Sequence, residues 1–216
     1  QVTDDLLDLY AGEEKITKYI DMPLQHINDR MLKRMHRLGN RAAIEKLVER
    51  IRSRIPGVTF RTAFIVGFPG ETEKAYQELK SYVAESGFDR VAAFLYSDEE
   101  DTTAVSLDDK IERSVMEERR NELLAIQEGI ASGRGQDRIG SVMEVLIEGP
   151  SEETPLLLEG RHEGLAPEID GVVYINDEPD LLTRPPRARL DVPRPVPGDL
   201  VKVEITDAAT YDLVGH

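Results

Sequence analysis

Residues 58–72 read VTFRTAFIVGFPGET, and this stretch decides the fold. Its first part, 58–66, is rich in β-branched and aromatic residues, which is typical of a buried strand. A glycine-containing turn follows at 67–70, and Glu71 and Thr72 are placed to cap a helix that we expect over 72–86. The stretch therefore predicts a strand, a tight turn and a helix in immediate succession.

The segments on either side repeat this pattern. Strands are expected at 18–22 and 90–96, and helices at 2–10, from Asn28 or Asp29, from Asn40 to about 55, and at 111–136. Alternating strands and helices indicate parallel βαβ units, which are wound right-handedly and bind ligands at the carboxyl ends of their strands. The predicted fold class is α/β; the family resemblance described below implies that this part is the C-terminal half of a partial parallel (βα) barrel.

Three parallel strands do not close a barrel, and they leave apolar edges that are normally paired. The chain also does not begin with Met. We therefore expect it to be the C-terminal part of a longer protein. We also expect the half barrel to expose an apolar edge and to self-associate.

The pattern changes near residue 138. Short strands are expected at 142–147, 156–158, 172–175, 200–205 and 211–214, with glycine and proline between them. Several short strands in so few residues predict a small antiparallel OB-like β-barrel. The predicted domains are 1–137 and 138–216, and the stretch 185–197, rich in proline and arginine, is expected to be a loop.

Composition limits the class of protein. Hydrophobic residues make up 40% and charged residues 32%, and no apolar run reaches the roughly 18 residues of a membrane span. The first residues have no basic or apolar character of a signal peptide, so a cytoplasmic location is expected. The chain has no cysteine. No thiolate-held metal site can therefore form from this chain alone, and neither metal ligands nor catalytic residues are assigned.

Negative charge is concentrated in the expected β-barrel. The formal net charge is −15, and from Gly140 onward there are 16 acidic and six basic residues, against 26 and 21 before it. Such a field repels nucleic acid and attracts basic partners.

Three places could bind a ligand. Gly67 and Gly70 allow close approach of the backbone to a ligand beside a helix N-terminus, although a capped turn without a ligand explains them as well. Gln25 ends the first strand and can hydrogen-bond ribose hydroxyls, whereas the neighbouring His26 is interpreted as structural. Tyr96 ends the third strand, where it either faces an adenine or covers the barrel mouth.

Four segments in order carry a family resemblance. They are YIDMPLQHINDRMLKRMHR at 19–37, TAFIVGFPGETE at 62–73, FLYSDEEDTTA at 94–104 and APEIDGVVYI at 166–175. The first three resemble the C-terminal half of the barrel in radical S-adenosylmethionine (SAM) methylthiotransferases. The first, second and fourth resemble the branch that modifies a ribosomal protein, and 138–215 resembles a TRAM domain, the substrate-binding module of that family.

The resemblance implies a role for each matched residue. Gln25 matches the position at which members of the family contact the SAM ribose. Ile65, Gly67 and Glu71 match the segment that supports the adenine, and Tyr96 lies near that segment. The family binds 4Fe-4S clusters through cysteines that are not in this chain, and one cluster reduces SAM to a 5′-deoxyadenosyl radical. The implied reaction places a methylthio group on the β-carbon of an aspartate in a small-subunit ribosomal protein. Because the cluster cysteines are absent, we expect this chain alone to be inactive.

Two alternatives compete with this hypothesis. A tRNA methylthiotransferase would share the barrel, but its TRAM domain should be basic to hold RNA phosphates. A non-catalytic substrate-binding module would keep recognition without chemistry. The acidic barrel favours a basic ribosomal protein as the partner and makes nucleic acid a poor one.

Overall fold

The computed structural model describes residues 2–99, 102–154, 156–176 and 195–216. They form two compact units, 1–130 and 131–216, each with its own core. Helix α5 (Arg113–Gln136) contributes to both, and the predicted boundary of 137/138 lies just beyond its end. Residues 185–194 of the expected proline-rich loop lie outside the described residues.

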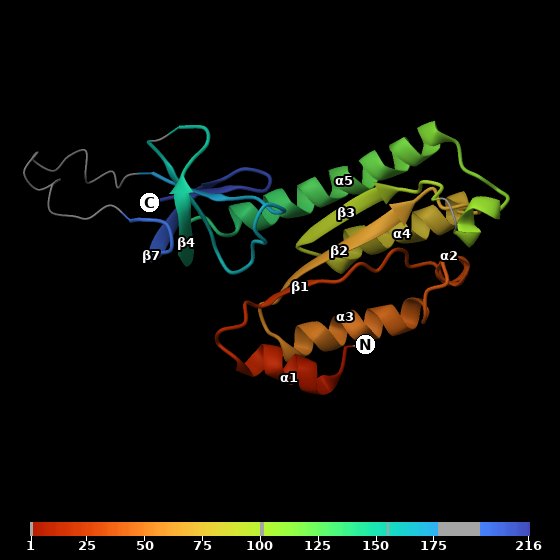
Figure 1. The fold of residues 1–216 in the computed structure, drawn as a ribbon, viewed down its shortest axis with the longest axis horizontal. Coiled ribbons are helices and arrows are strands. Elements are labelled where there is room, and N and C mark those ends of the chain that lie inside the picture. Colours follow the sequence, from red (N-terminus) through yellow and green to blue (C-terminus); the bar gives the residue numbers. More distant parts are fainter. Residues whose placement is uncertain (1, 100–101, 155, 177–194) are drawn as a thin grey trace, which may run out of the picture. The chain divides into compact units, whose positions relative to one another are not determined.

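The first unit contains one parallel sheet in the order β1-β2-β3 (Figure 1). Its strands are β1 (Tyr19–Asp21), β2 (Thr59–Val66) and β3 (Arg90–Leu95). Its other elements are α1 (Asp4–Gly12), α2 (Asp29–Arg34), α3 (Arg41–Arg54), α4 (Glu73–Ser86) and the short 3-10 helix η1 (Thr103–Ser106). The predicted α/β class and the parallel sheet are confirmed.

Local sequence explains where the helices of this unit begin. The side chains of Thr3, Asn28, Asn40 and Thr72 each accept a hydrogen bond from the backbone N–H three residues further on. These contacts satisfy N–H groups that have no partner inside the helix. Thr72 is therefore the cap of α4, and the Glu71 carboxylate makes other contacts.

Strand β2 separates two environments because successive side chains point to opposite faces. Phe60, Phe64 and Val66 are fully buried in the core formed with the helices, and Phe60 and Phe64 lie near the ring of Phe88. On the opposite face, Arg61 pairs with Asp21 of β1. Ala63 and Ile65 of that second face line a pocket, so the alternation along β2 assigns one face to the core and the other to the site.

The second unit is a closed five-stranded barrel in the order β4-β5-β6-β8-β7. The strands are β4 (Val142–Pro150), β5 (Leu158–Arg161), β6 (Val173–Ile175), β7 (Leu200–Ala208) and β8 (Leu213–Gly215). The predicted small barrel is confirmed, with two differences. Strand β5 begins at Leu158, where the predicted strand ends, and β6 pairs with β8 in parallel, because five strands cannot all run antiparallel to their neighbours around a closed barrel.

No helix in the described part of the chain combines the length and the apolar character needed to cross a bilayer.

Candidate functional site

A pocket of about 400 Å³ opens at the carboxyl ends of the three parallel strands. It is lined by Pro23, Gln25, Ala63, Ile65, Phe68, Phe94, Leu95, Tyr96, Ser97, Glu99, Thr102 and Ala104. Most of this surface is apolar, with a few polar groups at the rim, which is the usual composition of a small-molecule site. The pocket lies where parallel sheets bind ligands.

Gln25 is held in this pocket by its backbone. Its φ of 71° lies in the left-handed region, which costs roughly 1–2 kcal/mol for a residue other than glycine. The Gln25 N–H donates to the Ala63 carbonyl and the Gln25 carbonyl accepts from the Ile65 N–H, both at 2.9 Å. Two hydrogen bonds to β2 thus maintain a strained conformation. Among the described residues, the Gln25 side chain has no hydrogen-bond partner and is available to a ligand.

Aromatic rings form the opposite side of the pocket. Phe68 and Tyr96 meet edge to face with their centroids 5.0 Å apart. The Tyr96 hydroxyl donates to Asp98 at 2.8 Å, and the Lys110 ammonium lies over the ring and pairs with Asp98. Burial, followed by the hydrogen bond to Asp98, raises the pKa of Tyr96 above its ordinary value. The hydroxyl is therefore kept protonated and turned to Asp98, and the ring presents an apolar surface to the pocket.

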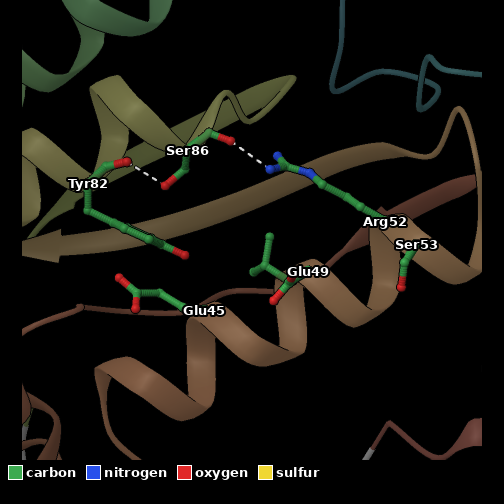
Figure 2. A pocket seen from close by; sticks show the side chains of 7 residues that line it. Glu45, Glu49, Arg52, Ser53, Tyr82 and Ser86 are labelled. Carbon is green, nitrogen blue, oxygen red and sulfur yellow. Dashed lines mark hydrogen bonds between the residues drawn. The ribbon is translucent and has the colours of Figure 1, made fainter.

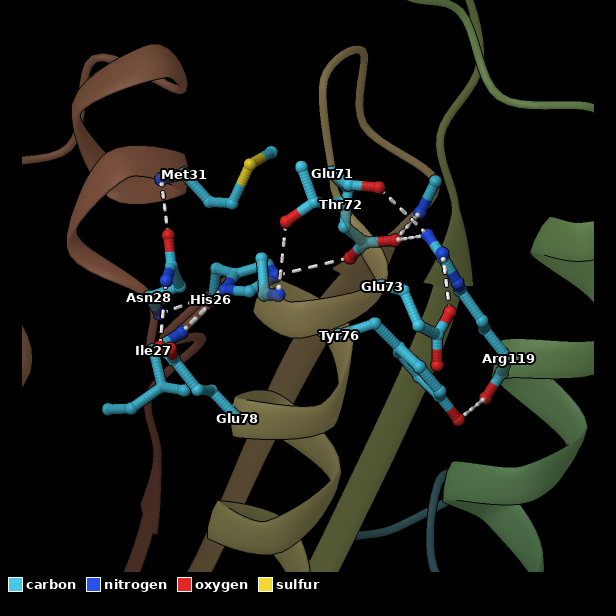
Figure 3. Close-up of polar contacts among 12 residues, drawn as sticks. His26, Ile27, Asn28, Met31, Glu71, Thr72, Glu73, Tyr76, Glu78 and Arg119 are labelled. Carbon is cyan, nitrogen blue, oxygen red and sulfur yellow. Dashed lines mark hydrogen bonds and ion pairs between the residues drawn. The ribbon is translucent and has the colours of Figure 1, made fainter.

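A buried polar network lies beneath the turn that follows β2 (Figure 3). The Nδ1 atom of His26 accepts hydrogen bonds from the backbone N–H groups of Ile27 and Asn28, at 2.9 and 3.0 Å. The proton of a neutral ring must then be on Nε2, which lies 3.1 Å from the Glu71 carboxylate. His26 is fully buried and satisfied at both nitrogens, as expected of a structural histidine.

Glu71 joins three segments of the chain. One carboxylate oxygen accepts from His26; the other accepts from the Gly67 N–H at 2.8 Å and from the Arg119 guanidinium at 2.6 Å. Arg119 also donates to the Glu71 carbonyl and to Glu73, and it lies over the Tyr76 ring. Burial, followed by the hydrogen bond to Glu122, raises the pKa of the Tyr76 hydroxyl. The network fixes the turn after β2 against α5.

The glycines of this turn are required by packing within the protein. Gly67 has a φ of 76°, and a Cβ there would meet the Met116 side chain at 2.3 Å. Gly70 has a φ of 82°, and its Cβ would lie 2.9 Å from the Arg34 guanidinium. Both positions therefore bring the backbone close to the protein's own side chains.

Of the five residues predicted to bind the cofactor, the structure brings three together. Gln25, Ile65 and Tyr96 line the pocket, whereas Gly67 and Glu71 are not among its lining residues. Contact of those two with SAM stays a prediction, and the Glu71 carboxylate is occupied by protein groups. Sequence reasoning missed Phe68, whose place inside the glycine turn was a usable signal. It also missed Arg119, for which no local signal exists.

A second cleft, of about 490 Å³, lies between α3 and α4 and contains none of the predicted residues. Figure 2 shows Glu45 and Glu49 on one side and Tyr82 on the other. Arg52 donates to the carbonyls of Ser86 and Gly87, at 2.7 and 3.0 Å, and this ties the two helices together. The cleft is therefore a feature of the packing between α3 and α4.

The described residues show no grouping of three or more His, Cys, Asp or Glu side chains that could hold a metal ion. Thiolate ligands for an iron–sulfur cluster do not exist in the sequence either, because it has no cysteine. The chain's own residues thus fit SAM, through the Gln25 amide and the apolar pocket, but not a cluster.

Comparison with known proteins matches two regions of the chain to two families. Residues 1–83 match the radical SAM superfamily, and residues 139–216 match the TRAM domain. Over its whole length the chain is homologous to RimO methylthiotransferases. The resemblance expected from the four segments is confirmed.

The RimO relatives are named for methylthiotransfer to ribosomal protein uS12. Identity is 46% with the protein from Anaeromyxobacter sp. (strain K), 43% with that from Myxococcus xanthus and 44% with that from Aquifex aeolicus. The alignments cover 99–100% of this chain and 42–47% of these relatives. The chain therefore spans less than half the length of the relatives it matches.

Proposed function

We propose that this chain is the C-terminal part of a radical SAM methylthiotransferase that adds a methylthio group to the β-carbon of an aspartate in a small-subunit ribosomal protein. The observation that carries the proposal is continuous similarity, at 40–46% identity, to RimO proteins along the entire chain. The pocket at the strand ends supports it, because it contains the matched residues Gln25, Ile65 and Tyr96.

In this proposal the pocket holds part of SAM. The Gln25 amide donates to and accepts from the ribose hydroxyls, and Ile65 with the ring of Tyr96 flanks the adenine. Glu71 acts on the pocket indirectly, by holding the Gly67 N–H and hence the turn that carries Phe68. When bound, SAM and the 4Fe-4S clusters supply the radical and sulfur chemistry.

The ligands of the clusters lie outside this chain, since it has no cysteine. In this proposal the residues of the chain bind and orient SAM, and they provide no thiolate and no redox group. We therefore propose that this chain alone is inactive and that activity requires the additional length found in the relatives.

The barrel unit is proposed to dock the substrate. From Gly140 onward it has 16 acidic and six basic residues, and ribosomal proteins are basic. Complementary electrostatic fields favour the encounter of such partners and their correct relative orientation. The same field opposes the tRNA substrate of related methylthiotransferases.

The test uses the full gene product, reconstituted anaerobically with iron and sulfide and supplied with SAM and a reductant. Mass spectrometry of the small-subunit protein should find one methylthio group on one aspartate. Gln25→Ala should weaken binding of SAM, measured by calorimetry before any turnover, by roughly tenfold, because lost hydrogen bonds to a ligand cost about 1.5 kcal/mol.

Two controls accompany this test. Gln77→Ala, on the outer side of α4, should leave SAM affinity unchanged. The 216-residue chain alone, treated identically, should cleave no SAM; cleavage would contradict the proposed inactivity. Modification of tRNA in place of the ribosomal protein would overturn the proposed substrate.

A further inference from the structure

A short basic segment stands out from the acidic chain. Residues 30–41, RMLKRMHRLGNR, contain five Lys and Arg residues and no Asp or Glu, in a protein of net charge −15. The segment comprises most of α2 and the turn that follows it. Its charge is therefore local and opposite in sign to that of the protein as a whole.

The two sides of α2 differ sharply. Met31 and Leu32 are buried, and Met31 packs with Phe68. Arg30, Lys33 and Arg37 are exposed; Arg30 and Lys33 lie three residues apart on α2, and Arg37 lies in the turn that follows the helix. Within the described residues, no hydrogen bond or ion pair engages these three side chains. We call them the basic patch.

The remaining charges of the segment already have partners. Arg34 turns inward and donates to the carbonyls of Pro69 and Asp108, at 2.8 and 3.2 Å. Arg41 pairs with Glu45, and the neighbouring acid, Asp29, accepts from the Arg41 backbone N–H. The basic patch thus consists of those cations that intramolecular contacts leave available.

The turn after α2 has a defined shape. The Arg37 N–H donates to the Leu32 carbonyl at 2.8 Å and the His36 N–H to the Lys33 carbonyl at 3.1 Å, the pattern of a Schellman motif. His36 takes the left-handed position, with a φ of 53°, where glycine is usual. Beyond it, Leu38 is 97% exposed. The patch and an apolar tip are presented together on an ordered turn.

Helix electrostatics explain only part of this charge. Cations near a helix C-terminus are stabilised by the helix dipole, which accounts for Lys33 and Arg34 in the last turn. Arg30 lies in the first turn, where the dipole disfavours a cation, and Arg37 lies beyond the helix. A binding role accounts for all three members of the patch.

Helix α2, which carries Arg30 and Lys33, packs against a residue that lines the candidate pocket, because Met31 and Phe68 share one buried cluster. Arg34, from the same helix, bonds the carbonyl of Pro69, and the adjacent Phe68 lines the pocket. A macromolecule held by the patch would therefore lie on the helix that packs against the pocket lining.

We propose that the basic patch binds the phosphates of an RNA backbone, and that the substrate is recognised as a protein already bound to RNA. This rests on the function proposed above. Arginine suits phosphate because its planar guanidinium donates two parallel hydrogen bonds. A basic protein assembled on RNA displays both signs of charge, matching the acidic barrel and the basic patch respectively.

The test compares two variants of the full gene product that each lose two exposed cations. Arg30→Gln/Arg37→Gln alters the patch; Lys15→Gln/Lys46→Gln is the control with the same charge change elsewhere. Binding is measured to small-subunit ribosomal particles and to the free ribosomal protein, over a range of salt concentrations. The patch variant should bind particles roughly tenfold more weakly, with a salt slope reduced by about 1–2, and should bind the free protein unchanged.

The control variant should bind both like the unmodified protein. Equal weakening by both variants, or no weakening by the patch variant, would overturn the proposal. Competition by polyglutamate but not by an RNA hairpin would also overturn it, in favour of an acidic protein partner. If the unmodified gene product binds neither particles nor free protein, it is the proposed function that fails.

Discussion

The two units satisfy their strand edges in different ways. In the barrel unit, 131–216, each strand pairs on both sides and the sheet closes on itself. In the βα unit, 1–130, the outer edges of β1 and β3 have no strand partner among the described residues. Closure removes edges without help from other chains, whereas an open parallel sheet depends on what lies beyond it. Among the described residues, one unit thus pairs all its strand edges internally, and the other leaves two strand edges open.

The units also bury charge differently. The βα unit places an ion pair in its interior, between Glu71 and Arg119, with side-chain exposures of 0% and 8%. The buried hydrophobic cluster of the barrel unit consists of Val145, Leu165, Val173, Val203, Ile205 and Leu213. Its many charges lie largely on the surface. Removing one buried charge should therefore lower the stability of the βα unit. Adding atoms to the tightly packed interior should lower the stability of the barrel unit.

Separating the units should produce the largest effect. We expect the isolated 1–130 fragment to self-associate through its open strand edges, and the 131–216 fragment to remain a folded monomer. Sedimentation velocity on both fragments at matched concentrations would check this. A monodisperse 1–130 monomer would show that the open edges are tolerated and would remove the main contrast between the units.

Glu71→Gln should destabilise the βα unit by about 3 kcal/mol, because it leaves the Arg119 charge buried without its closest partner. The unfolding transition of the barrel unit should not move. Denaturant unfolding, monitored by amide hydrogen exchange, resolves the stabilities of the two units. Glu73→Gln removes an exposed partner of the same arginine and should cost less than about 1 kcal/mol. Equal effects of the two variants would refute the structural role given to Glu71.

Gly160→Ala should destabilise the barrel unit by about 2 kcal/mol. A Cβ at this position would lie 2.4 Å from the Leu146 carbonyl oxygen and 2.8 Å from a Val145 methyl group, and the carbonyl cannot move away without disturbing the β4–β5 pairing. The melting temperature of the 131–216 fragment would measure the change. An unchanged value would mean that the barrel is looser than its strand register indicates.

Gly129→Ala and Gly133→Ala should give the smallest effect and the opposite sign. Both glycines are exposed within α5, and a Cβ there meets nothing within 4 Å. Alanine in a helix interior is more stable than glycine by roughly 0.5–1 kcal/mol. Gly129 belongs to the βα unit and Gly133 to the barrel unit, so each substitution should stabilise its own unit in denaturant unfolding. Destabilisation by either would indicate that α5 is strained where the units meet along the chain.

Much of the fold follows from the sequence because its signals are local. β-Branched and aromatic composition indicated the strands. Capping side chains indicated helix starts at Asn28 or Asp29, at Asn40, and at Glu71 and Thr72, since a cap bonds a backbone group only a few residues away. The structure uses Asn28, Asn40 and Thr72. The ordered motifs indicated the RimO resemblance in the same way. Gln25 and Tyr96 could be placed at one edge because the ends of parallel strands meet there, and Ile65 followed from the family resemblance; all three line the pocket.

Tertiary structure alone decided what the remaining residues do. Glu71 looked like a helix cap or a ligand contact, but its partners His26 and Arg119 are 45 and 48 residues away in sequence. Gly67 looked like an opening for a ligand, yet the space beside it is filled by Met116. A buried carboxylate must accept hydrogen bonds from the donors that the fold places beside it. Close packing fills the space that a missing side chain leaves. Neither outcome is encoded within a few residues of the position it concerns.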